Sequence, residues 1–188
     1  MNRIFCNFAE KYKKMKKLRF ISMVCLLALF VASLTGCKKE ENNTNNGGGS
    51  DQAGYVDLGL PSGTKWKASN ETKDNGDVYY TYDEAISAFG DKMPTKEQCE
   101  ELKNNCTWEW QNNGCYKVTG INGNSIDLPA VGMRSCDGDV VSVGSFGGYW
   151  SSTPGESGVA WILAFNSSGV WVGHNNRCSG FIVRLVQD

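Results

Sequence analysis

One short stretch near the C-terminal end of the sequence combines an aromatic ring with several polar side chains. An exposed aromatic ring can stack on the apolar face of a sugar, while neighbouring amides bond the sugar hydroxyls. Loops carry binding residues more often than strands do. We therefore predict ligand contacts from one ring and the loop that follows it, namely Trp171, His174, Asn175, Asn176 and Arg177.

The same region offers little for catalysis or metal binding. His174 is the single histidine and could act as a general base, but no Gly-x-Ser-x-Gly or comparable nucleophile motif accompanies it, so a catalytic triad is not predicted. Calcium needs about six to eight oxygen ligands. Asp137 and Asp139 supply two carboxylates, with Asn175 or Asn176 as further candidates. We interpret Asp-Gly-Asp as a turn and predict no metal and no cofactor.

Five cysteines follow Cys37, at positions 99, 106, 115, 136 and 178. An odd number leaves at least one of them unpaired. Cys99 and Cys106 are separated by about 10.5 Å of helical rise, whereas a disulfide needs Cα atoms within about 7 Å. We predict that these two are buried apolar residues, and that Cys136 and Cys178 form a long-range disulfide in an oxidising compartment.

Two helices are predicted from their capping boxes. Thr81 and Glu84 form the first box, and the apolar spacing that follows predicts a helix over 82–89. A second box begins at Thr95 and predicts a helix that ends near Asn105.

After the second helix the pattern changes to short runs rich in aromatic and β-branched residues, separated by Asn and Gly turn formers. Trp150 and Trp161 lie in these runs and are predicted to be core residues. Upstream, residues 55–66 are predicted to form a hairpin around a Pro-Ser-Gly turn. Helices followed by a meander of strands indicate an α+β domain. The predicted strands are 108–110, 116–119, 125–128, 149–152, 160–165, 170–172 and 181–186.

The N-terminal region has the plan of an export signal, with a basic run before an apolar stretch at 20–34. That stretch is shorter than the roughly 20 residues of a membrane-spanning helix. It ends in Leu-Thr-Gly-Cys, which resembles the lipobox of bacterial lipoproteins. The resemblance implies cleavage before Cys37, with acyl chains on this cysteine that hold the protein on a membrane. We therefore predict a signal peptide over 1–36, with Met15 as an alternative start to Met1.

Residues 37–54 are predicted to be a lipid-anchored, flexible tether because 42–50 contains no apolar residue. The sequence Lys-Lys-Glu-Glu at 38–41 resembles the tag that some Bacteroidota lipoproteins use to reach the outer face of the outer membrane; the alternative is a solvated tether. We expect an outer-membrane protein displayed at the cell surface. Residues 38–188 hold 12 Lys and Arg against 19 Asp and Glu, so no nucleic-acid partner is predicted.

Seven motifs follow one another in the remaining domain, residues 55–188, at 55–66, 93–102, 105–108, 116–120, 128–132, 149–153 and 183–184. In this order they resemble the motifs of the Fibrobacter succinogenes major paralogous domain family of secreted proteins. The resemblance implies a C-type lectin-like fold with two short helices and a small twisted, mainly antiparallel sheet. It implies no settled activity. The loop after Trp66 is shorter than usual for the family, and Leu185 stands where proline is common.

The resemblance also bears on sites. Lectin-like domains that bind sugar through calcium typically use Glu-Pro-Asn and Trp-Asn-Asp, and this sequence contains neither tripeptide. Formylglycine-generating enzymes share a related scaffold and bind copper through a cysteine pair, which Cys136 and Cys178 could imitate. That comparison rests on fold analogy alone.

Our leading hypothesis is a surface-exposed or periplasm-facing lipoprotein whose domain binds a glycan or a protein without catalysis. The first alternative is a structural component of a cell-envelope assembly, and the second is an enzyme on the formylglycine-generating scaffold. A glycan binder should present aromatic rings beside polar groups in a concave patch, whereas an envelope component should present a flatter apolar patch or an unpaired strand edge. The enzyme requires Cys136 and Cys178 within reach of one metal.

Overall fold

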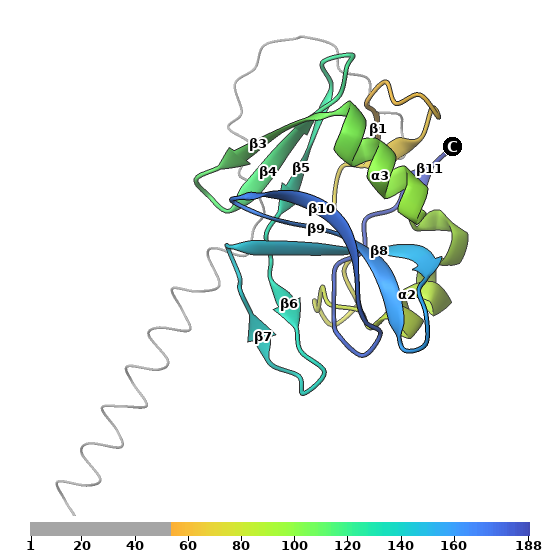
Figure 1. Ribbon diagram of the computed structural model, residues 1–188, viewed down its shortest axis with the longest axis vertical. Coiled ribbons are helices and arrows are strands. Elements are labelled where there is room, and N and C mark those ends of the chain that lie inside the picture. Colours follow the sequence, from red (N-terminus) through yellow and green to blue (C-terminus); the bar gives the residue numbers. More distant parts are fainter. Residues whose placement is uncertain (1–53) are drawn as a thin grey trace, which may run out of the picture. The chain divides into compact units, whose positions relative to one another are not determined.

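The computed structural model describes residues 54–188 (Figure 1). The predicted signal peptide, the lipid site at Cys37 and the tether up to residue 53 lie outside the described residues. Within 54–188, no helix is long and apolar enough to cross a membrane.

Both predicted helices are confirmed. They are α2 (Tyr82–Phe89) and α3 (Lys96–Asn105), with a short 3₁₀ turn (Gly90–Lys92) after the first. The Thr81 hydroxyl accepts a hydrogen bond from the Glu84 amide at 3.3 Å, and the Glu84 carboxylate accepts one from the Thr81 amide at 2.8 Å. The second helix begins with the same reciprocal box. At the N-terminus of each helix, nearby side chains therefore bond backbone amides that would otherwise lack a partner.

The strands of residues 54–188 divide among several small antiparallel sheets, which confirms the α+β class but not a single sheet. The first sheet contains β1 (Tyr55–Asp57), β2 (Lys65–Lys67) and β11 (Val186–Gln187), and the second contains β3 (Thr107–Gln111), β4 (Cys115–Thr119) and β5 (Ser125–Pro129). The central sheet has the order β10-β9-β8, formed by β8 (Phe146–Pro154), β9 (Val159–Asn166) and β10 (Gly169–Asn176). A two-stranded ribbon pairs β6 (Met133–Arg134) with β7 (Val140–Val141).

The predicted strand over 181–186 is wrong for most of its length. The Ile182 amide donates to the Gly148 carbonyl at 3.1 Å, whereas the Val183 carbonyl accepts from Glu71 at 2.9 Å. The backbone of this segment therefore forms hydrogen bonds to several different segments and does not pair continuously with one strand. Phe181, Ile182 and Val183 are completely buried, which explains the apolar run that suggested a strand.

The central sheet separates two hydrophobic clusters. On β9, Leu163 and Phe165 belong to one cluster, which also contains the buried face of α3. The alternate residues Ile162 and Ala164 belong to the other cluster, with the buried face of α2. This alternation is what a strand buried on both faces requires.

A pair of glycines on β8 makes this packing fit. A Cβ atom on Gly147 would lie 2.2 Å from the ring of Phe165, and a Cβ atom on Gly148 would lie 2.4 Å from the ring of Phe181. The two rings cover opposite faces of the strand, so each glycine makes room for one of them.

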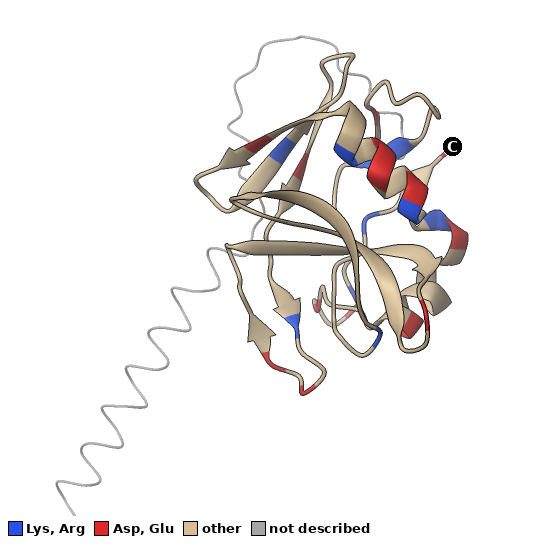
Figure 2. Cartoon of the chain, viewed as in Figure 1, with Lys and Arg blue, Asp and Glu red and all other residues tan. Residues whose placement is uncertain are grey.

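The central sheet carries no charged residue on any of its three strands, as Figure 2 shows. From Val140 to Asn176 the one charged side chain is Glu156, in the turn between β8 and β9. The helices, the loops and the strands of the other sheets do carry charges.

Candidate functional site

The predicted ligand-binding residues lie mainly on a strand rather than in a loop. Strand β10 was expected to end at residue 172, but it continues to Asn176. Its eight residues pair in continuous register with β9, from the tight turn at Gly169 and Asn166 to the pair of Asn176 with Val159. The loop prediction is therefore wrong, because pairing with β9 outweighs the low strand propensity of Gly, His and Asn.

Since side chains alternate along a strand, β10 sends the candidates to two faces. Trp171, Gly173 and Asn175 form what we call the Trp171 side. Val170, Val172, His174 and Asn176 form the His174 side, which also faces α3. The structure thus does not bring the five predicted residues into one surface.

Trp171 lies at the margin of the cluster that contains α2. Its ring packs against Phe146 with centroids 6.2 Å apart. Trp171 shares its row of the sheet with the small residues Ala164 and Gly148, and Phe146 lies in a neighbouring row on the same face. A Cβ atom on Gly173 would lie 3.3 Å from Trp171 Cδ1, so the indole covers this glycine. The side chain keeps 38 % of its surface exposed, which leaves one part of a fixed ring available to a ligand.

Asn175 is held in position on the same side. Its Oδ1 accepts hydrogen bonds from the Ser179 hydroxyl at 3.2 Å and the Asn176 amide at 2.8 Å. These bonds fix the amide group, and its Nδ2 donates to no residue within 54–188. The Trp171 side therefore combines a partly exposed ring with a positioned donor.

The His174 side has a different character. His174 is exposed and contacts the Trp161 ring edge to face, with centroids 5.8 Å apart. Lys96 of α3 places its Nζ 3.9 Å from the centre of the same indole, so that face of the ring is already occupied by a cation. Trp161 is only partly buried, and its prediction as a core residue is wrong, whereas Trp150 is completely buried as predicted.

Arg177 follows the end of β10 and is used by the fold. Its guanidinium lies 4.6 Å from the centre of the Tyr82 ring, with Nη1 3.7 Å from an Asp83 oxygen. Its Nε donates to the Val159 carbonyl at 3.3 Å. These contacts direct the side chain toward the start of α2.

Cys136 and Cys178 are joined by a disulfide, with Cα atoms 5.0 Å apart. The bond ties the loop between β6 and β7 to the chain just beyond β10 and closes 42 residues. In this oxidised form neither sulfur is a thiolate that could bind copper. Cys99 and Cys106 are free, and burial raises the pKa of the Cys106 thiol to about 11.

Asp137 and Asp139 form a turn, as predicted. The Ser135 carbonyl accepts from the Gly138 amide at 3.0 Å, and Gly138 has a φ of 98°, a conformation that favours glycine. Within residues 54–188, no group of three or more His, Cys, Asp or Glu side chains is placed to hold a metal ion.

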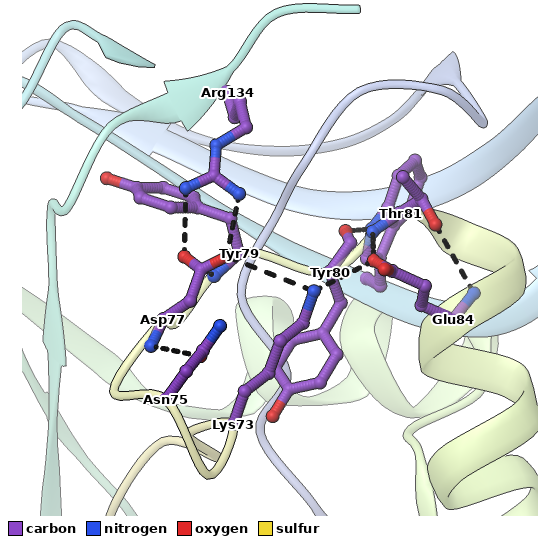
Figure 3. A network of polar contacts seen from close by, with 9 residues as sticks. Lys73, Asn75, Asp77, Tyr79, Tyr80, Thr81, Glu84 and Arg134 are labelled. Carbon is purple, nitrogen blue, oxygen red and sulfur yellow. Dashed lines mark hydrogen bonds and ion pairs between the residues drawn. The ribbon is translucent and has the colours of Figure 1, made fainter. Parts of the chain in front are cut away.

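A polar network supports the ribbon beside the central sheet (Figure 3). Arg134 of β6 donates two hydrogen bonds to Asp77, at 2.7 and 2.9 Å, and its guanidinium lies 4.9 Å from the centre of the Tyr79 ring. The bond from Arg134 holds the pKa of Asp77 below its usual value. Lys73 extends the network to Glu84 at 3.0 Å, so that the loop before α2, the helix and β6 are linked.

No feature of the sequence predicted a buried cation, yet Arg184 is 1 % exposed. Its Nε donates to Asn70 Oδ1, and its two terminal nitrogens donate to the carbonyls of Lys67 and Asp127, each at 2.8 Å. Burial lowers the pKa of Arg184, and the nearby Tyr149 opposes that shift. Through these bonds Arg184 links its own segment, residues 181–186, to β2 of the first sheet and β5 of the second. Its role is therefore structural.

Comparison of this chain with protein-family models, with curated proteins and with solved structures found no match.

Proposed function

We propose that this chain is a lipid-anchored protein of the outer membrane whose domain, residues 55–188, binds a glycan without catalysis. The leader pattern that ends at Cys37 supports the anchor. We also propose that the domain belongs to the Fibrobacter succinogenes major paralogous domain family and has a C-type lectin-like fold. Its two helices and small antiparallel sheets support that part of the proposal.

The observation that carries the glycan proposal is the arrangement of Trp171 above Gly173 with Asn175 beyond it. Two residues along a strand span about 7 Å, so Cα of Asn175 lies about 14 Å from that of Trp171 on the same face of the strand. An oligosaccharide with one ring stacked on the exposed part of the indole would extend along the strand toward Asn175 Nδ2. The indole Nε1 bonds to no residue within 54–188 and is a second donor on this side.

The absence of charge around Trp171 fits a neutral sugar. All three strands of the central sheet lack Lys, Arg, Asp and Glu. A neutral ligand loses little hydration energy there, whereas an ionic ligand would find no partner of opposite charge on the strands. We therefore propose neutral hexose-containing glycans as the ligand class.

A glycan array tests the proposal, with the full chain in detergent micelles. We expect binding that Trp171→Ala weakens at least tenfold, a loss of about 1.4 kcal/mol. His174→Ala is the matched control on the opposite side of β10 and should leave the affinity unchanged. Addition of a calcium chelator should also have no effect. Binding that survives Trp171→Ala, or that the chelator abolishes, would overturn the Trp171 site.

The lipid anchor has its own test. Metabolic labelling of expressing cells with a radioactive fatty acid should label the chain, and Cys37→Ser should remove the label and release the protein from the membrane fraction. Unchanged labelling of the Cys37→Ser variant would place the lipid elsewhere.

One observation favours a second function, attachment to another envelope protein. The β6 to β8 region exposes three valines: Val140, Val141 and Val143 are 45, 42 and 50 % exposed. Exposed apolar groups close together suit a protein surface better than a sugar. Photo-crosslinking in intact cells from position 143, with position 121 as the control on a distant exposed loop residue, should yield one discrete adduct if this function is correct.

A further inference from the structure

Strand β10 has an outer edge that the rest of residues 54–188 uses only at its last residue, Asn176. The Asn176 amide donates to the Asn175 side chain, not to β9, and its carbonyl accepts from Ser179 at 3.0 Å. Because outward and inward groups alternate in an antiparallel pair, Val170, Val172 and His174 also direct their backbone groups outward. None of these groups bonds to another residue within 54–188.

This open edge also lacks the usual protection. Exposed edge strands generally carry charged residues, proline or a bulge, which prevent another strand from pairing with them. The eight residues of β10 include no Lys, Arg, Asp, Glu or Pro, and their pairing with β9 is regular from end to end. No residue of β10 is buried, so its edge is not hidden within a core.

The charges on the other sheet edges indicate what can pair there. Strand β1 carries Asp57, β3 carries Glu109 and β5 carries Asp127. The remaining edge strands of the other sheets, β6, β7 and β11, have only two residues each, too few to pair along the eight residues of β10. Pairing β10 with β1, β3 or β5 would bring an acidic residue into the ladder of a domain that is already acidic. Pairing with another β10 brings none. Charge therefore favours a second copy of the same strand.

We infer that β10 pairs with β10 of a second copy of this chain, antiparallel and centred on Val172, to give a continuous sheet across a twofold axis. In this register Val170 of each copy lies opposite His174 of the other, and their outward backbone groups meet. Trp171 lies opposite Gly173 of the second copy, so the largest side chain of the strand faces the residue that has none. The contact is isologous, as closed dimers require.

This inference goes beyond the proposed glycan function and does not depend on it. Because the twofold axis is perpendicular to the sheet, both Trp171 side chains lie on one face of the dimer. If the glycan site is correct, the dimer presents two such sites side by side, and linked sites bind repetitive ligands more tightly than one site does.

Sedimentation equilibrium of the full chain in a density-matched detergent tests the inference. We expect a reversible dimer whose population rises with protein concentration. His174→Glu places a carboxylate on the open edge and should raise the dissociation constant at least tenfold. Asn176→Glu is the matched control. It adds the same charge on the same side of β10, at a residue whose backbone groups are already bonded. It should change the dissociation constant less than twofold.

Both substitutions are at exposed positions, and an unchanged melting temperature in dilute protein, where the chain is monomeric, will confirm that each variant is folded. A wild-type chain that remains monomeric at every concentration would overturn the inference. A dimer that both variants weaken equally would also overturn it, since the contact would then lie outside the open part of β10.

Discussion

The two edge strands of the central sheet, β8 and β10, resemble each other in composition but not in surroundings. Neither carries a charged residue. The outer edge of β8 bonds to the segments at Gly132 and Ile182, and five of its nine residues are buried. The outer edge of β10 has no such neighbour within 54–188, and none of its residues is buried.

The lack of charged residues therefore has a different explanation on each strand. At β8 the lack of charge is explained by burial, because charged groups are costly to bury. At β10 burial does not explain it, since the strand is accessible. We interpret an accessible strand without charge as evidence for a contact with another molecule. Both the glycan site and the dimer depend on β10.

The largest expected effect comes from breaking the segment that covers β8. Arg184→Ala removes three buried hydrogen bonds and leaves two carbonyls and an amide oxygen without their donor. Together with the lost packing, this should lower the free energy of unfolding by about 3 kcal/mol or more. Chemical denaturation monitored by tryptophan fluorescence measures the change.

Arg177→Ala is the matched control for that substitution. Its partners are a ring, a carbonyl and a distant carboxylate near the surface, so we expect a loss below about 1 kcal/mol. Equal losses for the two arginines would contradict the role given to Arg184.

A smaller effect should separate the glycines of the two edge strands. Gly148→Ala forces a methyl group toward Phe181, and such overpacking costs about 1–3 kcal/mol. Gly173→Ala meets only the edge of Trp171 at 3.3 Å, which can shift because the ring is partly exposed. We expect it to change stability by less than about 0.5 kcal/mol. Thermal unfolding compares them, and a greater cost at Gly173 would mean that β10 is packed as tightly as β8.

The smallest effect concerns the ribbon beside β8. The pKa of Asp77 is lower in the folded chain than in the unfolded chain, mainly because of the bond from Arg134. Its carboxylate therefore adds stability above the unfolded pKa, about 4, and this contribution is lost as the pH falls through the lower folded value. Asp77→Asn should cost about 1 kcal/mol at neutral pH and should flatten the loss of stability below pH 4. An unchanged acid profile would show that the pair is not coupled to folding.

Local features of the fold were predictable from the sequence, whereas long-range ones were not. Thr81 and Thr95 each sit three residues before a matching Glu or Gln, so the helix starts were visible in a short window. The extent of β10 was not visible, because its last residues are stabilised by pairing with β9 and not by their own propensity. The burial of Arg184 depends on acceptors more than 50 residues away.

The candidate site likewise has features that the sequence predicts and features that only the structure shows. Trp171 was recognised from its residue type, but the assignment of Trp171 and His174 to opposite faces requires the register of the strand. Arg177 was grouped with them by sequence proximity alone, and its contact with Tyr82 of α2 could not be inferred from spacing.

Hydrogen exchange of the full chain in micelles, resolved to single amides, tests most directly whether β10 is the open edge. In dilute protein we predict fast exchange at Val170, Val172 and His174 and slow exchange at Trp150 and Ile182, whose amides bond across the covered edge. On concentration, the three β10 amides should become protected while the others do not change. Equal protection of both sets in dilute protein would contradict the account, because the edge of β10 would then be closed within a single chain.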